Sequence, residues 1–596
     1  MKRKDFEKKK QDYQQKQIRF VNPYNFISLG AKCNRINWYE MEDRSLTGVI
    51  ECTLDTKTPI FIPNSTNMNA FQHKNYVKEE ARTLEFYSYN TIVENSLTSQ
   101  MFDPVIPASE LRGVIRSAYE AVTDSCMSTV CTDEVLYSRT SIPWKPGILR
   151  KDERGYYIQP SRKYRVPQSE TDGIEEGEKV YFEVVGKNNK AKIVTRGSKE
   201  GYFHRGEYFP KKKHEAIFME TKEKPIPLPQ NFDAIEHLRK VLCLYNKENK
   251  INRQENHKEY AHYKLEEGKP ILVYYAEYNG NFYLSPACIS KMVFHKTVKE
   301  ILDEQGGYSP CVNEEVCPAC ALFGMVSSNR SFASRLRFTD GRVVREENMK
   351  GFFESPKVLS GLSSPKLSAM EFYLEPPSEA DWWTYDYAGK WNGNGKNGKM
   401  FVVDENYKPR LRGRKFYWHS QQVKWMNYDS NKSLSPLECV IRPVKKGVKF
   451  SFRIFFDGIS EVELKRLIWT LNIGDNENTH YHKIGMGKPL GLGSVKIKVD
   501  RVKIRKIVLC RDTIEYKESE RNYSIEEIES HIDKMKKNIA EFLRITKFSD
   551  DIRNISYPIT AENSAEGYKW FVENRRGEKI KQSLPHILDD DITLKG

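Results

Sequence analysis

The chain has no apolar run that approaches the length of a membrane-spanning helix, which argues against an integral membrane protein. Its first residues, MKRKDFEKKKQDYQQKQ, lack the apolar segment of a secretory signal peptide. The eleven cysteines are odd in number and unevenly spread, which argues against a complete disulfide framework. We therefore expect a cytoplasmic protein with reduced thiols and no membrane partner.

Several catalytic and nucleotide-binding signatures are also missing. No Ser–His–Asp arrangement, paired-carboxylate motif or HD-type metal pattern stands out. In the glycine-rich stretch 480–499, HYHKIGMGKPLGLGSVKIKV, Gly487 and Lys488 are followed by Pro489, where a phosphate-binding loop needs Ser or Thr. The element expected after this stretch is a strand, so no helix N-terminus faces a phosphate. The dinucleotide-binding fingerprint fails for the same reason.

Positive charge, by contrast, is abundant. The 596 residues carry a formal net charge of +15, with 12% aromatic and 39% hydrophobic residues. This excess favours a polyanionic partner, and nucleic acid in particular, because Arg and Lys accompany aromatics and glycines at several places. A basic surface that serves only solubility is the alternative. In the stretch 480–499, glycines let the main chain approach a polyanion, and Lys483 and Lys488 add charge beside it. A hairpin turn with incidental glycines is the other interpretation.

Hydrophobic periodicity predicts a series of strands and amphipathic helices. Ser109 and Ser460 are placed to cap two of the helices. The expected elements are a strand at 49–62, a helix at 109–123, a strand at 450–459, a helix at 460–473, a strand at 491–499 and a last helix at 525–543.

A cysteine cluster with metal-ligand spacing lies near the middle of the chain. Cys311, Cys317 and Cys320 form C-x5-C-x2-C, in which the CPAC turn lets two thiolates point at one ion. A structural zinc site needs a fourth ligand, for which His295 is the first choice and Cys288 the second. Such a site would hold a loop that lacks a core of its own. Three buried free cysteines are the alternative, and the remaining cysteines, Cys126 among them, show no such spacing.

Three segments of the chain resemble motifs of the RAMP superfamily of CRISPR-associated proteins. HKIGMGKPLGLGSVKI is similar to the glycine-rich loop of that superfamily, and IPASELRGVIRSAYEAV to its PxSxLKGxxR helix. CPACALFG followed by SRLRFTDG resembles the cysteine-bearing segment and strand of backbone subunits of type III effectors. The stretches PYNF, SSPK, RGRKFYWH and FYLSPA resemble the longer, insertion-bearing RAMP proteins of these systems.

The resemblance implies an α+β fold with a ferredoxin-like βαββαβ core, related to the RNA recognition motif. A second SxLRG-type helix and a second glycine loop are not visible, so we expect one core with a large, mostly β insertion and a C-terminal extension. The expected division is a basic arm at 1–18, the first part of the core at 19–140, the insertion at 141–285, a zinc-knuckle segment and core strand at 286–345, a loop-rich basic segment at 346–435, the second part of the core at 436–505 and a helical extension at 506–596.

The resemblance also implies that the protein binds guide RNA and presents it for pairing with target RNA, together with other type III CRISPR subunits. Arginine suits this task because it pairs with phosphate without reading sequence. The residues that would contact RNA are Ser109, Arg112, Arg116, Lys366, Arg412, Arg414, Lys415, Lys483, Gly485, Gly487, Lys488, Gly491 and Gly493. For Arg112 and Arg116 a solvated helix face is the alternative, and Tyr417 and Trp418 could stack bases or lie in a core.

Some subunits of this kind cut target RNA with an Asp in the loop between the first strand and the first helix. Asp103 is the only Asp of that loop, and Glu94 is the nearest Glu. Asp103 lies closer to the helix than the family position, and capping the turn before Pro104 is the alternative role. An endoribonuclease that cuts target RNA or a guide precursor, with a divalent metal, and a scaffold that contacts only proteins are therefore the rival functions.

Overall fold

The centre of the molecule is a mixed α/β core built on one sheet. In the computed structural model, β4 (Leu46–Thr56) lies between β30 (Lys449–Ile459) and β32 (Ser494–Cys510) and pairs antiparallel with both. The full strand order is β31 (His482–Lys483), β32, β4, β30, β22 (Gly341–Val343) and β6 (Val105–Ile106), with β21 (Leu336–Phe338) also on β30 and β33 (Thr513–Glu520) also on β32.

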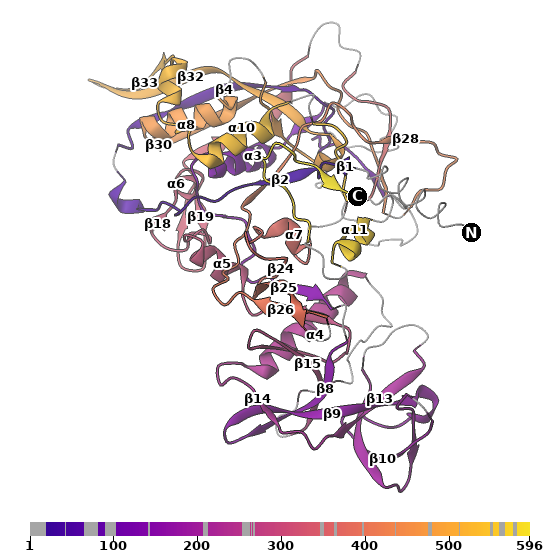
Figure 1. Ribbon diagram of the computed structural model, residues 1–596. Helices are drawn as coiled ribbons and strands as arrows, with labels where there is room; N and C mark the ends of the chain where they lie inside the picture. Colours follow the sequence, from indigo (N-terminus) through magenta and orange to yellow (C-terminus); the bar gives the residue numbers. More distant parts are fainter. Residues whose placement is uncertain are drawn as a thin grey trace.

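The chain crosses this sheet twice by way of a helix. From β4 it runs through α3 (Ala108–Val122) to β21 and β22, on the far side of β30. From β30 it runs through α8 (Glu461–Asn472) to β32, on the far side of β4. Figure 1 shows α3 and α8 together against this sheet, with α10 (Lys537–Thr546) beside them. The core forms here because alternate residues of β30 (Phe450, Phe452, Ile454 and Phe456) are buried in the same cluster as the apolar sides of both helices.

Two helix starts show what the sequence pattern could and could not reveal. Ser460 caps α8 as expected: its side chain accepts the N–H of Glu463, whose carboxylate in turn accepts the N–H of Ser460. Ser109 was expected to cap α3, but the helix begins at Ala108. The Ala108 N–H donates to the carboxylate of Asp340 at 2.9 Å, so a residue distant in sequence supplies the cap.

The single helix expected at 525–543 is two helices, α9 (Ile525–Glu529) and α10. Between them the Asp533 carboxylate accepts the N–H of Met535 at 3.1 Å, a local turn that competes with helix formation. The segment before α9 is also not helical, because β32 and β33 form an antiparallel hairpin there. At the chain ends, β1 (Arg19–Phe20) pairs with β34 (Leu594–Lys595), and α11 (Gly567–Asn574) packs Trp570 against Phe20.

Residues 145–285 build a sheet of their own, which lies at the opposite end of the molecule from the core sheet in Figure 1. Helix α4 (Ala234–Asn252) contacts its last strand. The strands are β8 (Lys145–Asp152), β9 (Gly155–Pro167), β10 (Lys179–Val184), β11 (Ala191–Val194), β12 (Lys199–His204), β13 (His214–Glu220), β14 (Ile226–Pro227), β15 (Ile271–Tyr278) and β16 (Asn281–Ser285).

Short ladders and helices connect these two parts. Four of the ladders are pairs: β2 (Tyr24–Ile27) with β27 (Arg414–Tyr417), β3 (Ile36–Asn37) with β18 (Glu315–Val316), β7 (Tyr137–Arg139) with β17 (Lys291–Val293), and β19 (Met325–Val326) with β20 (Ser331–Phe332). One small sheet contains, in order, β28 (Met426–Asn427), β23 (Lys357–Leu359), β29 (Cys439–Ile441) and β5 (Arg82–Leu84). Another contains β24 (Trp382–Trp383), β25 (Ala388–Gly395) and β26 (Gly398–Val403). The connecting helices are α5 (Val298–Glu304), α6 (Pro318–Phe323) and α7 (Met370–Tyr373).

The structure describes residues 19–41, 43–64, 82–89, 103–140, 143–186, 188–206, 212–252, 263, 265, 269–345, 351–362, 366–395, 398–435, 437–474, 479–511, 513–548, 552–558, 567–575 and 581–596. The expected arm at 1–18 and the candidate Glu94 lie outside these residues. Within them, no helix combines the length and the apolar character needed to cross a membrane.

Candidate metal centre and basic pocket

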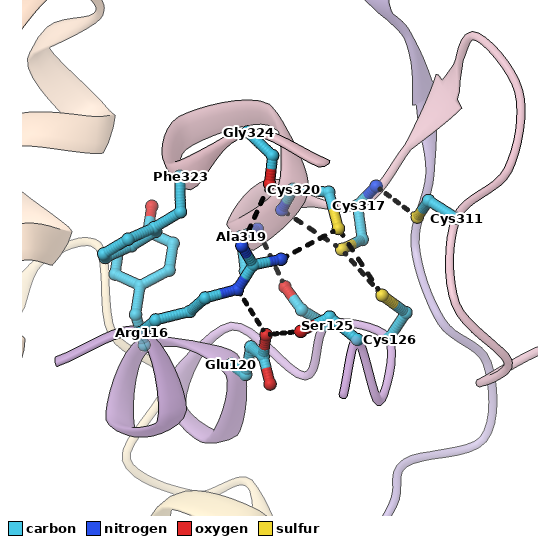
Figure 2. Close-up of polar contacts among 12 residues, drawn as sticks. Arg116, Glu120, Ser125, Cys126, Cys311, Cys317, Ala319, Cys320, Phe323 and Gly324 are labelled. Atoms are coloured by element: carbon cyan, nitrogen blue, oxygen red, sulfur yellow. Dashed lines mark hydrogen bonds and ion pairs between the residues drawn. The ribbon is translucent and has the colours of Figure 1, made fainter. Parts of the chain in front are cut away.

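Four cysteines from separate parts of the chain meet beside α3. Cys126 follows the end of α3, Cys311 lies ahead of β18, Cys317 is the N-cap of α6 and Cys320 lies within α6. Their sulfur atoms all lie within 4.8 Å of one another, and all four side chains are buried. Figure 2 shows the sulfurs converging between the end of α3 and α6.

The geometry of this cluster fits a metal ion held by thiolates. The Cys126 Sγ is 3.5 Å from that of Cys317 and 3.6 Å from that of Cys320. These separations are too long for a disulfide and near the roughly 3.8 Å that Zn–S bonds of about 2.3 Å give in a tetrahedron. The Cys317 N–H donates to the Cys311 Sγ at 3.3 Å, and sulfur contacts from Cys126 lower the pKa of the Cys317 thiol. The cluster could therefore hold a metal such as zinc.

The fourth residue of this cluster differs from the expected ligand. The His295 Nε2 lies 3.0 Å from the carbonyl oxygen of Phe282, and its ring stacks on that of His237. Cys288 is half-buried and is not in the cluster. Cys126 takes the fourth place because α3 ends against α6. It lies 191 residues before Cys317, so no local spacing could reveal the pair.

Arg112 and Arg116 point toward α6 rather than into solvent. Arg116 donates to Glu120 at 2.9 Å, to the carbonyl oxygen of Gly324 at 2.9 Å and to the Cys320 Sγ at 3.4 Å. Figure 2 shows this guanidinium between the two helices. Arg112 donates to the carbonyl oxygen of Phe323. On this side of α3 the arginines join the helix to the cysteine segment, and Arg116 places positive charge beside the Cys320 sulfur.

Arg412 and Arg414 are also engaged inside the protein. Arg412 is 3% exposed and donates to the carbonyl oxygen of Leu374, and burial lowers its pKa to about 10. Arg414 is 6% exposed, pairs with Asp124 at 3.4 Å and donates to the carbonyl oxygen of Ser125. The neighbouring Trp418 is buried as well. Arg414 and Trp418 therefore stabilise the junction between β27 and the end of α3, whereas Arg412 contacts the end of α7.

Contacts within the protein explain the conformation of the glycine-rich loop at 485–493. Gly485, Gly487, Gly491 and Gly493 all have φ between 75° and 98°, a region that favours glycine. A Cβ at Gly485, Gly491 or Gly493 would lie 2.1–2.5 Å from a main-chain oxygen. The Gly485 N–H donates to the Glu110 carboxylate of α3, and the Gly493 N–H to the carbonyl oxygen of Pro59. These glycines therefore fit the loop between α3 and the sheet, and those two amides are occupied.

Beside this loop, a cavity of about 240 Å³ opens between α3, β27, the loop and α10. Its α3 wall carries Gly113 and Ser117, which are exposed. Three lysines from the other walls line it: Lys415 on β27, Lys483 on β31 and Lys488 in the loop. The pocket thus brings together three of the expected basic residues, which come from two segments distant in the sequence.

The lysines of this cavity are half-buried cations with little compensating charge. Burial lowers the pKa of Lys415 to about 8, and burial with the nearby charge of Lys488 lowers that of Lys483 to about 7. Burial also lowers the pKa of Lys488. Glu110 is the acidic residue among the described residues that line the cavity, and its carboxylate already accepts the Gly485 N–H. An anion in the cavity would favour the charged form of each lysine.

The remaining candidates lie apart from both sites. The Asp103 carboxylate accepts two contacts from Arg345, at 2.8 and 2.9 Å, on the exposed edge of the core. Ser109 and Lys366 are exposed, and neither lines the basic cavity. The ribonuclease pair Asp103 and Glu94 cannot be completed from the described residues, since Glu94 is outside them.

The family model of the RAMP superfamily matches residues 53–496, well over half of the chain. A search of curated proteins gave no match.

Proposed function

The chain belongs to the RAMP superfamily, and we propose that it is a guide-RNA-binding backbone subunit of a type III CRISPR ribonucleoprotein. In that role it holds guide RNA by its sugar-phosphate backbone and leaves the bases free to pair with target RNA. Sequence specificity then comes from base pairing rather than from the protein.

The arrangement of the core supports an RNA-binding fold of the ferredoxin-like type. The order β32, β4, β30, β22, with antiparallel neighbours and with α3 and α8 in the two crossovers, is the order of a βαββαβ unit. Residues 141–285 are then an insertion between the first helix and the second strand of that unit. This assignment makes α3 the first helix and places the basic cavity beside it.

The observation that carries the proposal is the cavity itself. Three lysines from two distant segments converge on it, and burial has lowered the pKa of Lys415 and Lys483 toward neutrality. Lys483 donates to the carbonyl oxygen of Leu492, and Glu110 is the one carboxylate near Lys488 among the described residues that line the cavity, so a bound anion would stabilise the charged form of all three lysines. A phosphodiester supplies that charge without requiring a particular base.

A structural zinc ion at Cys126, Cys311, Cys317 and Cys320 is part of the proposal. These residues would hold α6 and the loop before it against the end of α3. Zinc bound in this way contributes directly to folding, since the segment 311–324 has few long elements of its own. No catalytic role is assigned to it, because all four positions are protein thiolates.

A second surface supports assembly with other subunits. The hairpin of β32 and β33 projects beyond the core in Figure 1. On it, Ile507 lies opposite Tyr516 and Leu509 opposite Ile514, and all four side chains are exposed. An apolar face of this kind on a projecting ribbon is suited to a protein partner. The variant Leu509→Glu with Ile514→Glu should reduce recovery of partner subunits, whereas Lys506→Glu beside them should not.

The salt dependence of RNA binding tests the proposed function. The full chain, freed of copurified nucleic acid, is titrated with fluorescent single-stranded RNA at a series of salt concentrations, from about 50 to about 400 mM. Neutralising the one phosphate in the cavity predicts a slope of about −0.7 in a plot of log K against log salt, and each further phosphate contact makes the slope steeper by about the same amount. The absence of binding, or a flat response, would contradict RNA binding and favour a scaffold that contacts only proteins.

A further inference from the structure

A stretch of chain near the N-terminus runs beside the cysteine cluster without contributing to the set of four converging sulfurs. The Cys33 N–H donates to the carbonyl oxygen of Gly306 at 2.9 Å, and further along this stretch β3 pairs with β18. Residues 33–38 therefore lie beside 306–316, the segment that carries Cys311. The metal centre thus borders a part of the chain outside the segments that provide its thiolates.

Arg35 is the half-buried arginine of this stretch. Its guanidinium donates at 2.6 Å to the carbonyl oxygen of Ser309, which lies just before Cys311. Burial acts to lower the pKa of Arg35, but attraction to Cys311 and Cys33 more than offsets it, so the pKa is raised. The Arg35 Nε is buried and has no hydrogen-bond partner in the described part of the chain. Positive charge with a spare donor therefore lies beside the sulfur atoms.

No carboxylate of the described residues forms an ion pair with Arg35. Asp303 attracts it from a longer distance. The Asp303 carboxylate, however, is already bonded to Lys299 at 2.6 Å and to the Ser309 hydroxyl. The charge of Arg35 is consequently not taken up by an acidic partner within the protein.

The cysteine cluster, once it holds a metal, needs such a charge. Four thiolates and one divalent ion leave a surplus of two negative charges, which is costly in a buried site unless cations surround it. Arg116 donates to the Cys320 Sγ at 3.4 Å but is also paired with Glu120 at 2.9 Å. Arg35 has no such pair, so its whole charge is available to the thiolates.

We infer that Arg35 is a positioning residue of the metal centre, whose guanidinium offsets the negative charge of the zinc-bound thiolates and ties residues 33–38 to that centre. The inference rests on the zinc site of the proposed function and extends it to a residue that is not a ligand. Groups just outside a ligand shell commonly change metal affinity by about tenfold or more. Through this contact zinc stabilises residues 33–38 in addition to α6.

The variant Arg35→Met in the full chain tests the inference by competition with a zinc chelator. Zinc should bind at least about tenfold more weakly than to the wild type, because the compensating charge is gone. Arg35→Lys keeps that charge and should recover most of the affinity. Arg35→Gln, which can still donate to the Ser309 carbonyl oxygen, provides the same test without charge if the Met variant does not fold.

Arg44→Met is the matched control. Arg44 is also half-buried and donates to a main-chain carbonyl oxygen, that of Trp38, and in the described part of the chain its Nε too is buried without a partner. Its guanidinium, however, lies 4.5 Å from the centre of the Trp38 ring rather than beside sulfur. Arg44→Met should therefore bind zinc as tightly as the wild type.

Two further measurements separate this role from a general loss of stability. Co2+ loaded in place of zinc should keep its thiolate charge-transfer absorption in Arg35→Met, because Arg35 is not a ligand. Amide hydrogen exchange of residues 33–38 should become faster in zinc-loaded Arg35→Met, and in the wild type only after chelation. A merely destabilised fold would instead exchange faster throughout its core.

The outcomes are distinct. Weaker zinc binding in Arg35→Met that Arg35→Lys recovers and Arg44→Met does not show supports the inference. An Arg35→Met protein that binds zinc as tightly as the wild type overturns it while the zinc site stands. An equal loss of affinity in Arg44→Met, or loss of the Co2+ absorption in Arg35→Met, overturns it as well. A wild type that binds no zinc shows instead that the proposed metal site is wrong.

Discussion

The two sides of α3 differ in their surroundings in the structure. On one side, Arg112 and Arg116 are directed into the protein, toward α6 and the cysteine cluster. On the other, Gly113 and Ser117 are exposed beside three lysines. Arginine-rich character alone would place a polyanion on the first side. Burial and hydrogen bonding place the available charge on the second.

The difference shows that basic residues indicate where a polyanion binds only after those that pair within the protein have been left out. Arg116 and Arg414 each pair with a carboxylate, and Arg412 is buried against the main chain. The cavity lysines come from two segments distant in the sequence and meet beside the exposed Gly113 and Ser117 of α3. Substitutions on the two sides should therefore separate stability from RNA affinity.

The largest expected effect is on the cysteine side. Cys126→Ser removes one thiolate from the proposed metal site, so bound zinc should fall from about one ion per chain to nearly none. The melting temperature should fall by about 10 °C, because structural zinc contributes several kcal/mol or more to folding. Metal analysis and thermal unfolding, with and without a chelator, measure both quantities.

Cys131→Ser is the matched control, since Cys131 is exposed and lies outside the cluster. It should keep the metal and the melting temperature of the wild type. A Cys126→Ser protein that retains one zinc ion per chain would show that the fourth ligand is another residue.

Arg116→Met should have the next largest effect. It leaves the buried Glu120 without its guanidinium partner, at a cost of about 3 kcal/mol for a broken buried pair. Burial already raises the pKa of Glu120, so the carboxyl takes up a proton as pH falls and the penalty shrinks. The loss of stability should thus be larger at pH 8 than at pH 5.5, as urea unfolding at both pH values can measure.

Adding Glu120→Gln to Arg116→Met removes the stranded charge and should recover part of the lost stability and most of its pH dependence. RNA affinity of the folded fraction should match the wild type in both variants. A stable Arg116→Met protein with weakened RNA binding would reverse the assignment of the two sides of α3.

The smallest expected effect is a pH dependence on the lysine side. With its pKa lowered to about 7 in the free protein, Lys483 gains charge as pH falls, and only its charged form attracts phosphate. RNA affinity should therefore rise severalfold from pH 8.5 to pH 6.5 and level off below that. His419 and His482 face the same cavity, but burial lowers the pKa of both, that of His482 to about 4, so neither gains charge in this range.

Lys483→Arg keeps a cation at every pH and should reduce this dependence to the part that Lys415 contributes through its pKa of about 8, since arginine stays protonated throughout the range. Binding measured by anisotropy at constant ionic strength provides the comparison. An unchanged pH profile in Lys483→Arg would assign the proton uptake to another group.

Sequence patterns predicted the helices and strands whose formation depends on neighbouring residues. The alternation of β30 and the capping of α8 by Ser460 could be read directly, because both depend on residues within one element. The cap of α3 by Asp340 and the place of Cys126 in the cluster could not, because each joins segments about 200 residues apart. The contacts of the arginines could not be predicted either, because the sequence does not reveal whether an arginine contacts a phosphate or a carbonyl group of the protein.

The glycines illustrate the same limit. The loop at 485–493 was expected to present bare main chain, but positive φ and close main-chain oxygens explain its glycines within the fold. Gly113 stands at the glycine position of the PxSxLKGxxR-like motif, but the motif alone does not say whether the fold needs a glycine there. Only the space around each residue distinguishes a glycine that the fold needs from one that a ligand needs.

The salt slope of RNA binding compared between the two sides of α3 tests the central claim most directly. The variant Lys415→Met, Lys483→Met, Lys488→Met should lower the magnitude of the slope by about 0.7, the contribution of the one phosphate contact that the cavity makes on a single strand. The variant Arg112→Gln with Arg116→Gln should leave the slope of the folded protein unchanged. A slope that falls in the arginine variant and persists in the lysine variant would contradict the account.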